Sequence, residues 1–169
     1  GDGVGFAVEP EPLGTGNAVD CAREAAGDAD YVLILNGDVP LVLPATLRRL
    51  MAAVSGDGAP DLALLTASVP VEAYGVLDIT QDMRVQAINE TKGAEGIDRG
   101  EHRYINAGQY AVRASWLWSR LPRIEPAPNG ERYLTQLAAM AHSEGNAAIA
   151  VIAEEAVEVR GINDRVQLA

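Results

Sequence analysis

Short, continuous runs of apolar residues recur along the chain and predict buried strands. Residues 31–35 read YVLIL without polar alternation, which is the pattern of a strand covered on both faces, as in a parallel sheet. Two shorter runs flank a polar Gln81-Asp82 turn and predict a hairpin. In chain order, the strands expected from these runs cover residues 4–8, 31–35, 62–69, 76–80, 85–88, 105–112 and 147–152.

Helical patterns separate these runs. Pro44 suits the start of a helix that runs to about residue 55, with apolar residues at i, i+3, i+4 and i+7 from Leu47 to Val54. Gly27 suits the end of an Ala-rich helix. Further helices are expected over 18–26, around 116–121, over 133–142 and over 163–168, and a surface loop over 93–102.

Alternating strands and helices with one hairpin predict an α/β domain with a mixed, mostly parallel sheet. The 169 residues suit a single domain over 1–169, without an internal repeat or a low-complexity linker. An α/β nucleotide-binding domain usually opens on a strand and a Gly-rich phosphate turn, whereas this chain opens on what resembles a middle strand.

Composition narrows the possible partners. The 24 acidic and 13 basic side chains give a formal net charge of −11, and there is no Lys/Arg stripe, so we expect no nucleic-acid partner. Small anionic substrates remain possible, because a metal ion can reverse the local field. No apolar run is long enough for a membrane span, and Cys21 is the only cysteine, so we expect a cytoplasmic protein without a membrane partner.

Several polar residues stand where α/β sheets bind ligands, and each has two interpretations. Asp38 follows the YVLIL strand and could bind Mg²⁺ or simply cap a turn. The Gly14–Asn17 segment before a helix could approach a phosphate, although a tight turn is the simpler interpretation. Asn106 interrupts an apolar strand and could bind backbone or a sugar hydroxyl. Glu90 could be an ordinary solvated carboxylate, and Asn163 alone resembles a helix N-cap.

The order of these motifs is more specific than any one of them. The succession EPLGTGNAV, LNGDVPL, AYGVLDIT, INETKGA, YINAGQYAV, ERYLTQL and EVRGINDRVQL resembles the uridylyltransferase domain of bacterial N-acetylglucosamine-1-phosphate uridylyltransferases over nearly the whole chain. The resemblance implies a Rossmann-like nucleotidyltransferase fold and a Mg²⁺ cofactor. It also implies transfer of UMP from UTP to N-acetylglucosamine 1-phosphate, with release of pyrophosphate, as a step that supplies cell-wall synthesis.

The resemblance also assigns roles to individual positions. It implies that Asp38 and Asn163 bind the magnesium ion, and that no side chain acts as nucleophile or general base. The positions implied to contact the nucleoside triphosphate are Glu9, Gly14, Thr15 and Asn36, and those implied to contact the sugar 1-phosphate are Gly75, Glu90, Asn106 and Thr135.

Three positions depart from the family pattern and leave the substrates open. Glu9 replaces a Gln that reads the uracil edge, and a carboxylate cannot donate a hydrogen bond to a carbonyl. Val76 and Gln136 stand where Arg and Asp are usual. A thymidylyl- or guanylyltransferase, or a non-catalytic module that binds a sugar nucleotide, therefore remains an alternative.

The family's Gly-rich loop, with its Arg and Lys for the triphosphate, would precede Gly1. We therefore expect little or no transferase activity from the 169-residue chain alone. No hexapeptide repeat of a following acetyltransferase is visible, and any homo-oligomer would form through a segment outside this chain.

Overall fold

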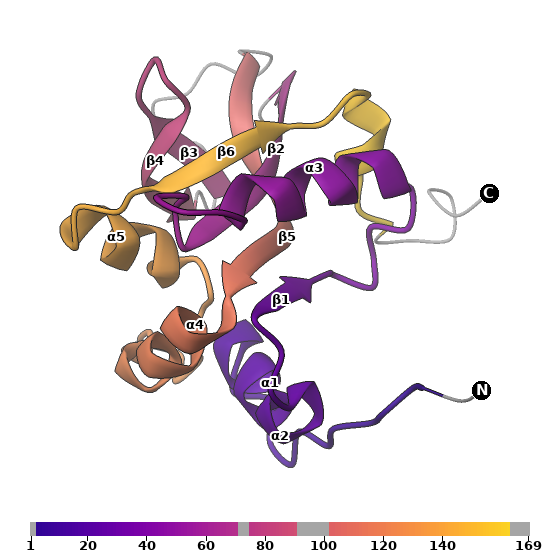
Figure 1. Cartoon of the computed structure of the whole chain (residues 1–169), viewed down its shortest axis with the longest axis vertical. Helices are drawn as coiled ribbons and strands as arrows, with labels where there is room; N and C mark the ends of the chain where they lie inside the picture. Colours follow the sequence, from indigo (N-terminus) through magenta and orange to yellow (C-terminus); the bar gives the residue numbers. More distant parts are fainter. Residues whose placement is uncertain (1–2, 71–74, 91–101, 163–169) are drawn as a thin grey trace.

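The structure is a computed structural model that describes residues 3–70, 75–90 and 102–162. A six-stranded mixed sheet runs through these residues in the order β1-β5-β2-β6-β4-β3, and helices lie on both of its faces (Figure 1). The strands are β1 (Tyr31–Ile34), β2 (Leu62–Pro70), β3 (Gly75–Ile79), β4 (Arg84–Glu90), β5 (His102–Arg113) and β6 (Ala148–Ile152).

Two hydrophobic cores lie on the opposite faces of the sheet. Successive residues of a strand point to opposite faces, so Leu62 and Leu64 of β2 enter one core while Ala63 and Leu65 enter the other. The second core is covered by α3 (Pro44–Val54) and η2 (Ala156–Val159). The helices α1 (Thr15–Cys21), α4 (Ala114–Arg120), η1 (Leu121–Arg123) and α5 (Gln136–Ser143) contribute to the first, and α2 (Arg23–Ala26) follows α1.

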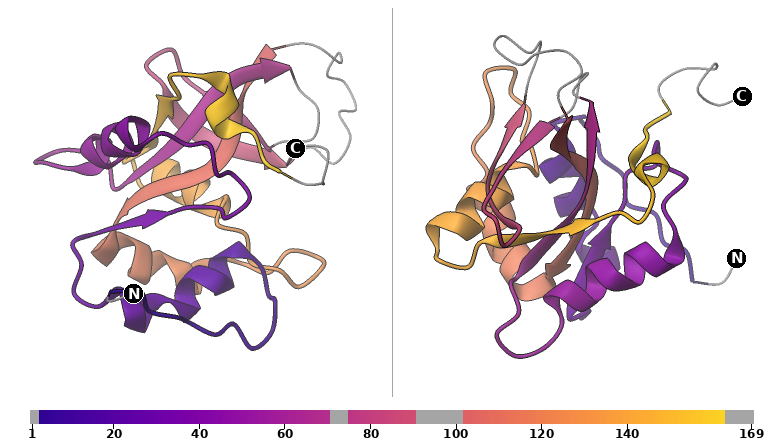
Figure 2. Two further views of the ribbon diagram at one scale, coloured as in Figure 1. Left: turned by 90° about the vertical axis from the view of Figure 1, so that its right-hand side faces the viewer. Right: turned by 90° about the horizontal axis from the view of Figure 1, so that it is seen from above.

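The prediction of a mostly parallel sheet is wrong for the described residues. Only β2 and β6 pair in parallel, whereas the pairs β1–β5, β2–β5, β3–β4, β4–β6 and β3–β5 are antiparallel. A continuous apolar run shows that a strand is covered on both faces, and an antiparallel strand between two helical layers has the same pattern. The β3–β5 pairing, Val76 opposite Ile105, curls the sheet back on itself (Figure 2).

The expected strand over 4–8 is also wrong. These residues are extended but pair with no described strand, and the Phe6 side chain is 91% exposed. The strand β1 lies where the sequence predicts it. It forms an edge of the described sheet, however, and its side chains are half-buried rather than covered on both faces. An apolar run alone therefore did not distinguish a central strand from an exposed one.

Most other elements lie where the sequence predicts them. The helix over 44–55, the hairpin of β3 and β4, and the later strands are confirmed. The helix over 18–26 begins earlier, at Thr15, and divides at Ala22 into α1 and α2. His102 begins β5 instead of ending a loop, while the expected loop over 93–101 and helix over 163–168 lie outside the described residues. No helix in the described part of the chain has the length and apolar character of a membrane span.

One irregularity in β5 shapes the candidate site. The pairs Leu64–Tyr110 and Thr66–Asn106 flank a bulge, so three residues of β5, 107–109, stand opposite one residue of β2. Gly108 within the bulge has φ +79°, a left-handed conformation that side chains other than glycine rarely adopt. The bulge bends β5 beside the end of β1, where Asn36 and Asp38 follow.

Candidate functional site

A cavity of about 170 Å³ lies at the bulge of β5 and the ends of β1 and α1. It brings together four of the predicted substrate-binding residues, two assigned to the nucleotide and two to the sugar. We call it the Asn36–Asn106 pocket. Its lining residues are Thr15, Asn36, Asn106, Gly108, Tyr110, Tyr133, Leu134 and Thr135.

The pocket is smaller than a typical ligand site of about 300 to 1,000 Å³, but it is not isolated. A more apolar cavity of about 290 Å³ shares Thr15, Asn36 and Leu134 as lining residues. The two cavities therefore lie side by side, separated by the side chains that line both.

The Gly14-Thr15 turn is held by the segment before α5. Arg132 N–H donates to Leu13 O at 2.7 Å, and Gly16 N–H donates to Arg132 O at 2.8 Å. Gly14 has φ +97°, and a Cβ placed there would lie 2.7 Å from Arg132 O, so this close approach requires glycine. The Thr15 hydroxyl oxygen accepts the Leu134 N–H at 3.0 Å and can still donate its own hydrogen.

Asn106 stabilises the bulge from inside the pocket. Its Oδ1 accepts the Gly108 N–H at 3.1 Å, and its Nδ2 donates to the Tyr110 hydroxyl at 2.8 Å. The interpretation that the Asn106 amide binds a backbone group is therefore correct. The side chain is only half-buried and also lines the pocket, so one amide hydrogen still has the space to bind a ligand.

Gly108 is a site residue that we did not predict. A Cβ at this position would overlap Nδ2 of Asn36, so the glycine leaves room for the Asn36 side chain at the pocket wall. The sequence carried one signal, a glycine inside an otherwise apolar strand, which often marks a bulge or a close approach. Tyr110, Tyr133 and Leu134 line the pocket as well; they lie within the YINAGQYAV and ERYLTQL motifs, but no role was assigned to them.

The hairpin brings two of the sugar-assigned positions together. Gly75 pairs with Glu90 across β3 and β4. The next residue, Val76, pairs with Ile105, which directly precedes Asn106 on β5. The backbone register thus places three of the four sugar-assigned positions, Gly75, Glu90 and Asn106, at neighbouring places in the sheet.

Asp38 lies in the turn after β1, beside the end of the described chain. Its backbone oxygen accepts the Ile162 N–H at 2.7 Å, and Asn163 follows Ile162 immediately but lies outside the described residues. The Asp38 side chain is exposed, so its carboxylate has room for an ion that also binds substrate phosphates. A carboxylate and an amide oxygen are hard donors, and this donor set fits Mg²⁺.

Other predicted residues have structural partners away from the pocket. Oε1 of Glu9 accepts hydrogen bonds from Asn17 Nδ2 at 2.7 Å and from Leu13 N–H at 3.3 Å. Gln136 binds both backbone groups of Glu125, through Oε1 at 3.1 Å and Nε2 at 2.7 Å. Neither Glu9 nor Gln136 lines the Asn36–Asn106 pocket.

Thr135 differs from its neighbour Gln136, because it does line the pocket. It precedes α5 as the N-cap residue, yet its side chain makes no capping hydrogen bond. The hydroxyl is therefore placed beside the pocket without the usual structural role of a threonine at this position.

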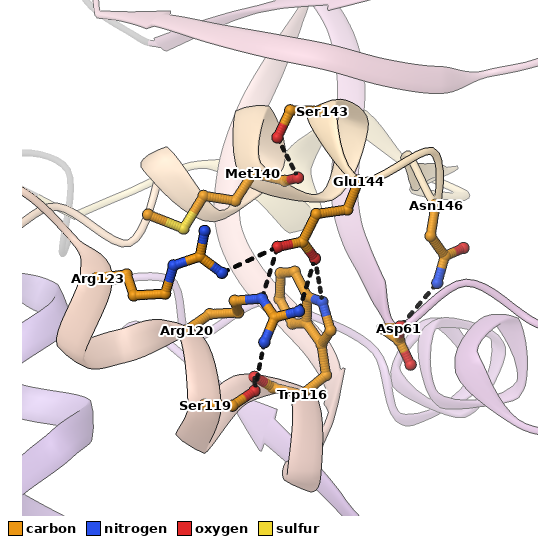
Figure 3. Close-up of polar contacts among 9 residues, drawn as sticks. All are labelled: Asp61, Trp116, Ser119, Arg120, Arg123, Met140, Ser143, Glu144 and Asn146. Carbon is orange, nitrogen blue, oxygen red and sulfur yellow. Dashed lines mark hydrogen bonds and ion pairs between the residues drawn. The ribbon is translucent and has the colours of Figure 1, made fainter.

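A separate polar cluster joins α4 to the end of α5 (Figure 3). Glu144 accepts hydrogen bonds from Trp116 Nε1 at 3.0 Å, from Arg120 Nε at 2.7 Å and Nη2 at 3.0 Å, and from Arg123 Nη1 at 3.2 Å. The Arg120 hydrogen bonds hold the pKa of the Glu144 carboxyl below its usual value. No predicted site residue belongs to this cluster, and we interpret it as structural.

Known proteins match the chain over nearly all of its length. The chain is similar to the bifunctional protein GlmU of Geobacter metallireducens, with 42% identity over 98% of this chain and 35% of the relative. It is also similar to the bifunctional proteins GlmU of Halorhodospira halophila, with 43% identity over 98% of the chain and 34% of the relative, and of Solibacter usitatus, with 35% identity over 99% and 36%. The chain thus spans about a third of the length of these relatives.

The family model described as "Nucleotidyl transferase" matches residues 3–157, which include the Gly14-Thr15 turn, Asp38 and every residue that lines the pocket. This match and the GlmU relatives agree with the motif order in the sequence. The chain belongs to the nucleotidyl transferase family.

Proposed function

We propose that the protein of which this chain is a part transfers UMP from UTP to N-acetylglucosamine 1-phosphate, giving UDP-N-acetylglucosamine and pyrophosphate. The observation that carries the proposal is the Asn36–Asn106 pocket. It joins residues assigned to the nucleotide and residues assigned to the sugar in one cavity, as a transferase for two substrates requires. The motif order, which resembles that of N-acetylglucosamine-1-phosphate uridylyltransferases, supports the same substrates.

In the proposed site, Gly14, Thr15 and Asn36 bind the nucleotide on one side of the pocket. Asn106 and Thr135 orient the sugar, and Gly75 and Glu90 extend its binding surface along the hairpin. Asp38 and Asn163 would hold Mg²⁺, which offsets negative charge on the phosphates when it is bound.

The proposed reaction needs no protein nucleophile. A phosphate oxygen of the sugar 1-phosphate attacks the α-phosphorus of UTP, the bond to the bridging oxygen of the β-phosphate breaks, and pyrophosphate leaves. The side chains of the pocket contribute by holding the two substrates in line, because positioning alone can lower such a barrier considerably.

Glu9 supports a second candidate, a guanylyltransferase on the same site. Its Oε1 already accepts two hydrogen bonds, and the remaining oxygen can only accept another. A guanine edge offers two donors, whereas uracil offers one donor and two acceptors. Competition between UTP and GTP for the full-length protein decides between them, and a clear preference for GTP would overturn the uridylyl assignment.

Other features of the proposal follow from the family and the composition. We expect a Rossmann-like domain, because the chain belongs to the nucleotidyl transferase family and its described residues form a mixed sheet with helices on both faces. We also expect a cytoplasmic location, because a single cysteine is typical of reducing compartments. Two further expectations stay predictions: that any homo-oligomer forms through a segment outside this chain, and that the 169-residue chain alone has little or no transferase activity.

A pyrophosphate-release assay on the full-length protein tests the proposed function. The assay compares UTP, dTTP and GTP, each with several sugar 1-phosphates, with Mg²⁺ and with excess EDTA. We expect release with UTP and N-acetylglucosamine 1-phosphate that EDTA abolishes. Tight binding of UDP-N-acetylglucosamine without any release would instead identify a binding module.

A further inference from the structure

Glu158 is a buried carboxylate that no predicted role uses. It is 1% exposed and lies in η2, at the start of the EVRGINDRVQL motif. Its described hydrogen-bond donors are backbone groups rather than a cation. A carboxylate is costly to bury, so a position that retains one on the inner side of a short helix calls for an explanation.

The two oxygens of Glu158 bind different parts of the chain. Oε1 accepts the Glu155 N–H at 3.0 Å and closes the capping box of η2. Oε2 accepts the Leu43 N–H at 3.0 Å. Leu43 is the N-cap residue of α3, and its own N–H, which an N3 side chain accepts in a capping box, is here accepted by Glu158 from 115 residues further along the chain.

The charge of Glu158 is stabilised where it stands. Burial raises its pKa, but the nearby Thr46 hydroxyl and the backbone N–H groups together outweigh that effect and hold the pKa below its usual value. Thr46 lies in the first turn of α3 and is itself fully buried, although its hydroxyl makes no hydrogen bond of ordinary geometry. The start of α3 adds to this effect, because the free N–H groups and the dipole at a helix N-terminus favour a negative charge.

The two segments joined by Glu158 are those that carry the proposed magnesium ligands. Leu43 ends the loop that begins at Asp38, and Glu158 precedes Asn163 by five residues. The second connection between these segments is the Ile162 N–H bond to Asp38 O at 2.7 Å. The Glu158 carboxylate and this bond thus hold the two segments together at both ends.

We propose that Glu158 is a positioning residue of the magnesium site, which fixes the Asp38 loop by tying the end of that loop at Leu43 to η2. The inference rests on the proposed function, because it takes Asp38 as a metal ligand. Mg²⁺ requires nearly ideal octahedral geometry, so a shift of Asp38 weakens its binding. Residues that orient metal ligands in this way typically affect metal affinity by about 10- to 100-fold.

The test uses three variants of the full-length protein. Glu158→Ala removes both acceptors, and Glu158→Gln retains the size and one acceptor but loses the charge. Glu154→Gln is the matched control, because it removes a carboxylate from the same segment. The Glu154 side chain is 50% exposed, and its Oε1 lies 3.6 Å from Arg49 Nη1 in a surface ion pair. The Mg²⁺ concentration for half-maximal pyrophosphate release and the KM for sugar 1-phosphate are measured for each.

We expect Glu158→Ala to raise the half-saturating Mg²⁺ concentration about tenfold or more, with Glu158→Gln between it and the control, and with little change in the sugar-phosphate KM. Hydrogen exchange in the metal-free protein provides a readout that is independent of activity. The Ile162 amide, which does not touch Glu158, exchanges faster in Glu158→Ala than in Glu154→Gln.

A half-saturating Mg²⁺ concentration within about twofold of the control would overturn the inference, because a purely structural residue lowers the active fraction without changing metal affinity. The wild-type protein separates this failure from that of the proposed function. If the wild type releases no pyrophosphate in a Mg²⁺-dependent manner, the function itself is wrong.

Discussion

The side-chain amides of Asn106, Gln136 and Gln109 have different surroundings. Asn106 and Gln136 both bind backbone groups. Gln109 is fully buried in the bulge of β5, and neither its Oε1 nor its Nε2 has a hydrogen-bond partner among the described residues. An unpaired buried amide lowers stability, because it loses its hydrogen bonds to water without replacing them.

Gln109→Met should therefore stabilise the protein. Methionine has the same unbranched length and removes the unpaired groups, so we expect the free energy of unfolding to rise by about 1 to 2 kcal/mol in urea unfolding. Gln136→Met is the control, because its amide is paired with Glu125, and it should lower stability by about 1 kcal/mol. A loss of stability in Gln109→Met would show that the amide has a partner.

Gly14→Ala should destabilise the protein strongly. The new Cβ would meet Arg132 O in a left-handed backbone conformation, and we expect a loss of about 2 to 5 kcal/mol in the free energy of unfolding. Gly130→Ala separates the two causes, since Gly130 has φ +85° but open space around it. It should cost about 1 kcal/mol, from backbone strain alone. Equal losses in the two variants would mean that the Arg132 contact is unimportant.

For individual residues, the sequence predicted which ones belong to the site better than it predicted their contacts. Thr15, Asn36, Asn106 and Thr135 were predicted from the motif order and meet in one pocket. Gly108 and Glu158 were missed, because the role of each depends on a contact with a distant segment, Asn36 for Gly108 and Leu43 for Glu158. Glu9 was predicted as a base reader, and the structure adds that it already binds Asn17.

The elements of the fold were predicted well where the periodic hydrophobic pattern extends over many residues. The helix α3 begins at Pro44 as expected, and its residues Leu50 and Val54 are fully buried. Strand pairing was not predicted well, because the apolar runs of β2 and β5 record burial on both faces but not strand direction. The short η2 was missed altogether, since four residues have no readable period.

The contact between α4 and α5 gives a prediction at the scale of elements. Glu144 joins Trp116 of α4 to the residue after α5 (Figure 3), and its pKa is lowered from 4.5 by the hydrogen bonds of Arg120. Its contribution to stability is therefore fully present above pH 4.5 and is lost as pH falls through the lower folded pKa.

Thermal unfolding of Glu144→Gln between pH 3 and pH 7 checks this assignment. We expect Glu144→Gln to be less stable than the wild type at pH 7, and the difference between them to shrink toward pH 3. Glu125→Gln, which alters an exposed carboxylate in the loop after η1, serves as the control and should follow the wild type. A difference that stays constant with pH would contradict the charge-based role of Glu144.

For the whole molecule, the pocket is built where four parts of the chain converge. These are the turn into α1, the end of β1, the bulge of β5 and the segment before α5, and the segment after η2 returns to Asp38. Family membership explains why the motif order was informative, because several of these motifs supply residues that line the pocket. Substrate identity could not be read in the same way, since Glu9 and Gln136 depart from the pattern and have structural partners here.

The central claim is a magnesium-dependent uridylyl transfer in which Asp38 binds the ion. Its most direct test is the rate of UDP-N-acetylglucosamine formation by the full-length protein as Mg²⁺ is varied, for the wild type, Asp38→Asn and the exposed control Asp57→Asn. We predict that Asp38→Asn lowers the rate by about 100-fold at limiting Mg²⁺, with partial recovery at high Mg²⁺, while Asp57→Asn matches the wild type. A wild-type rate in Asp38→Asn at every Mg²⁺ concentration would contradict it.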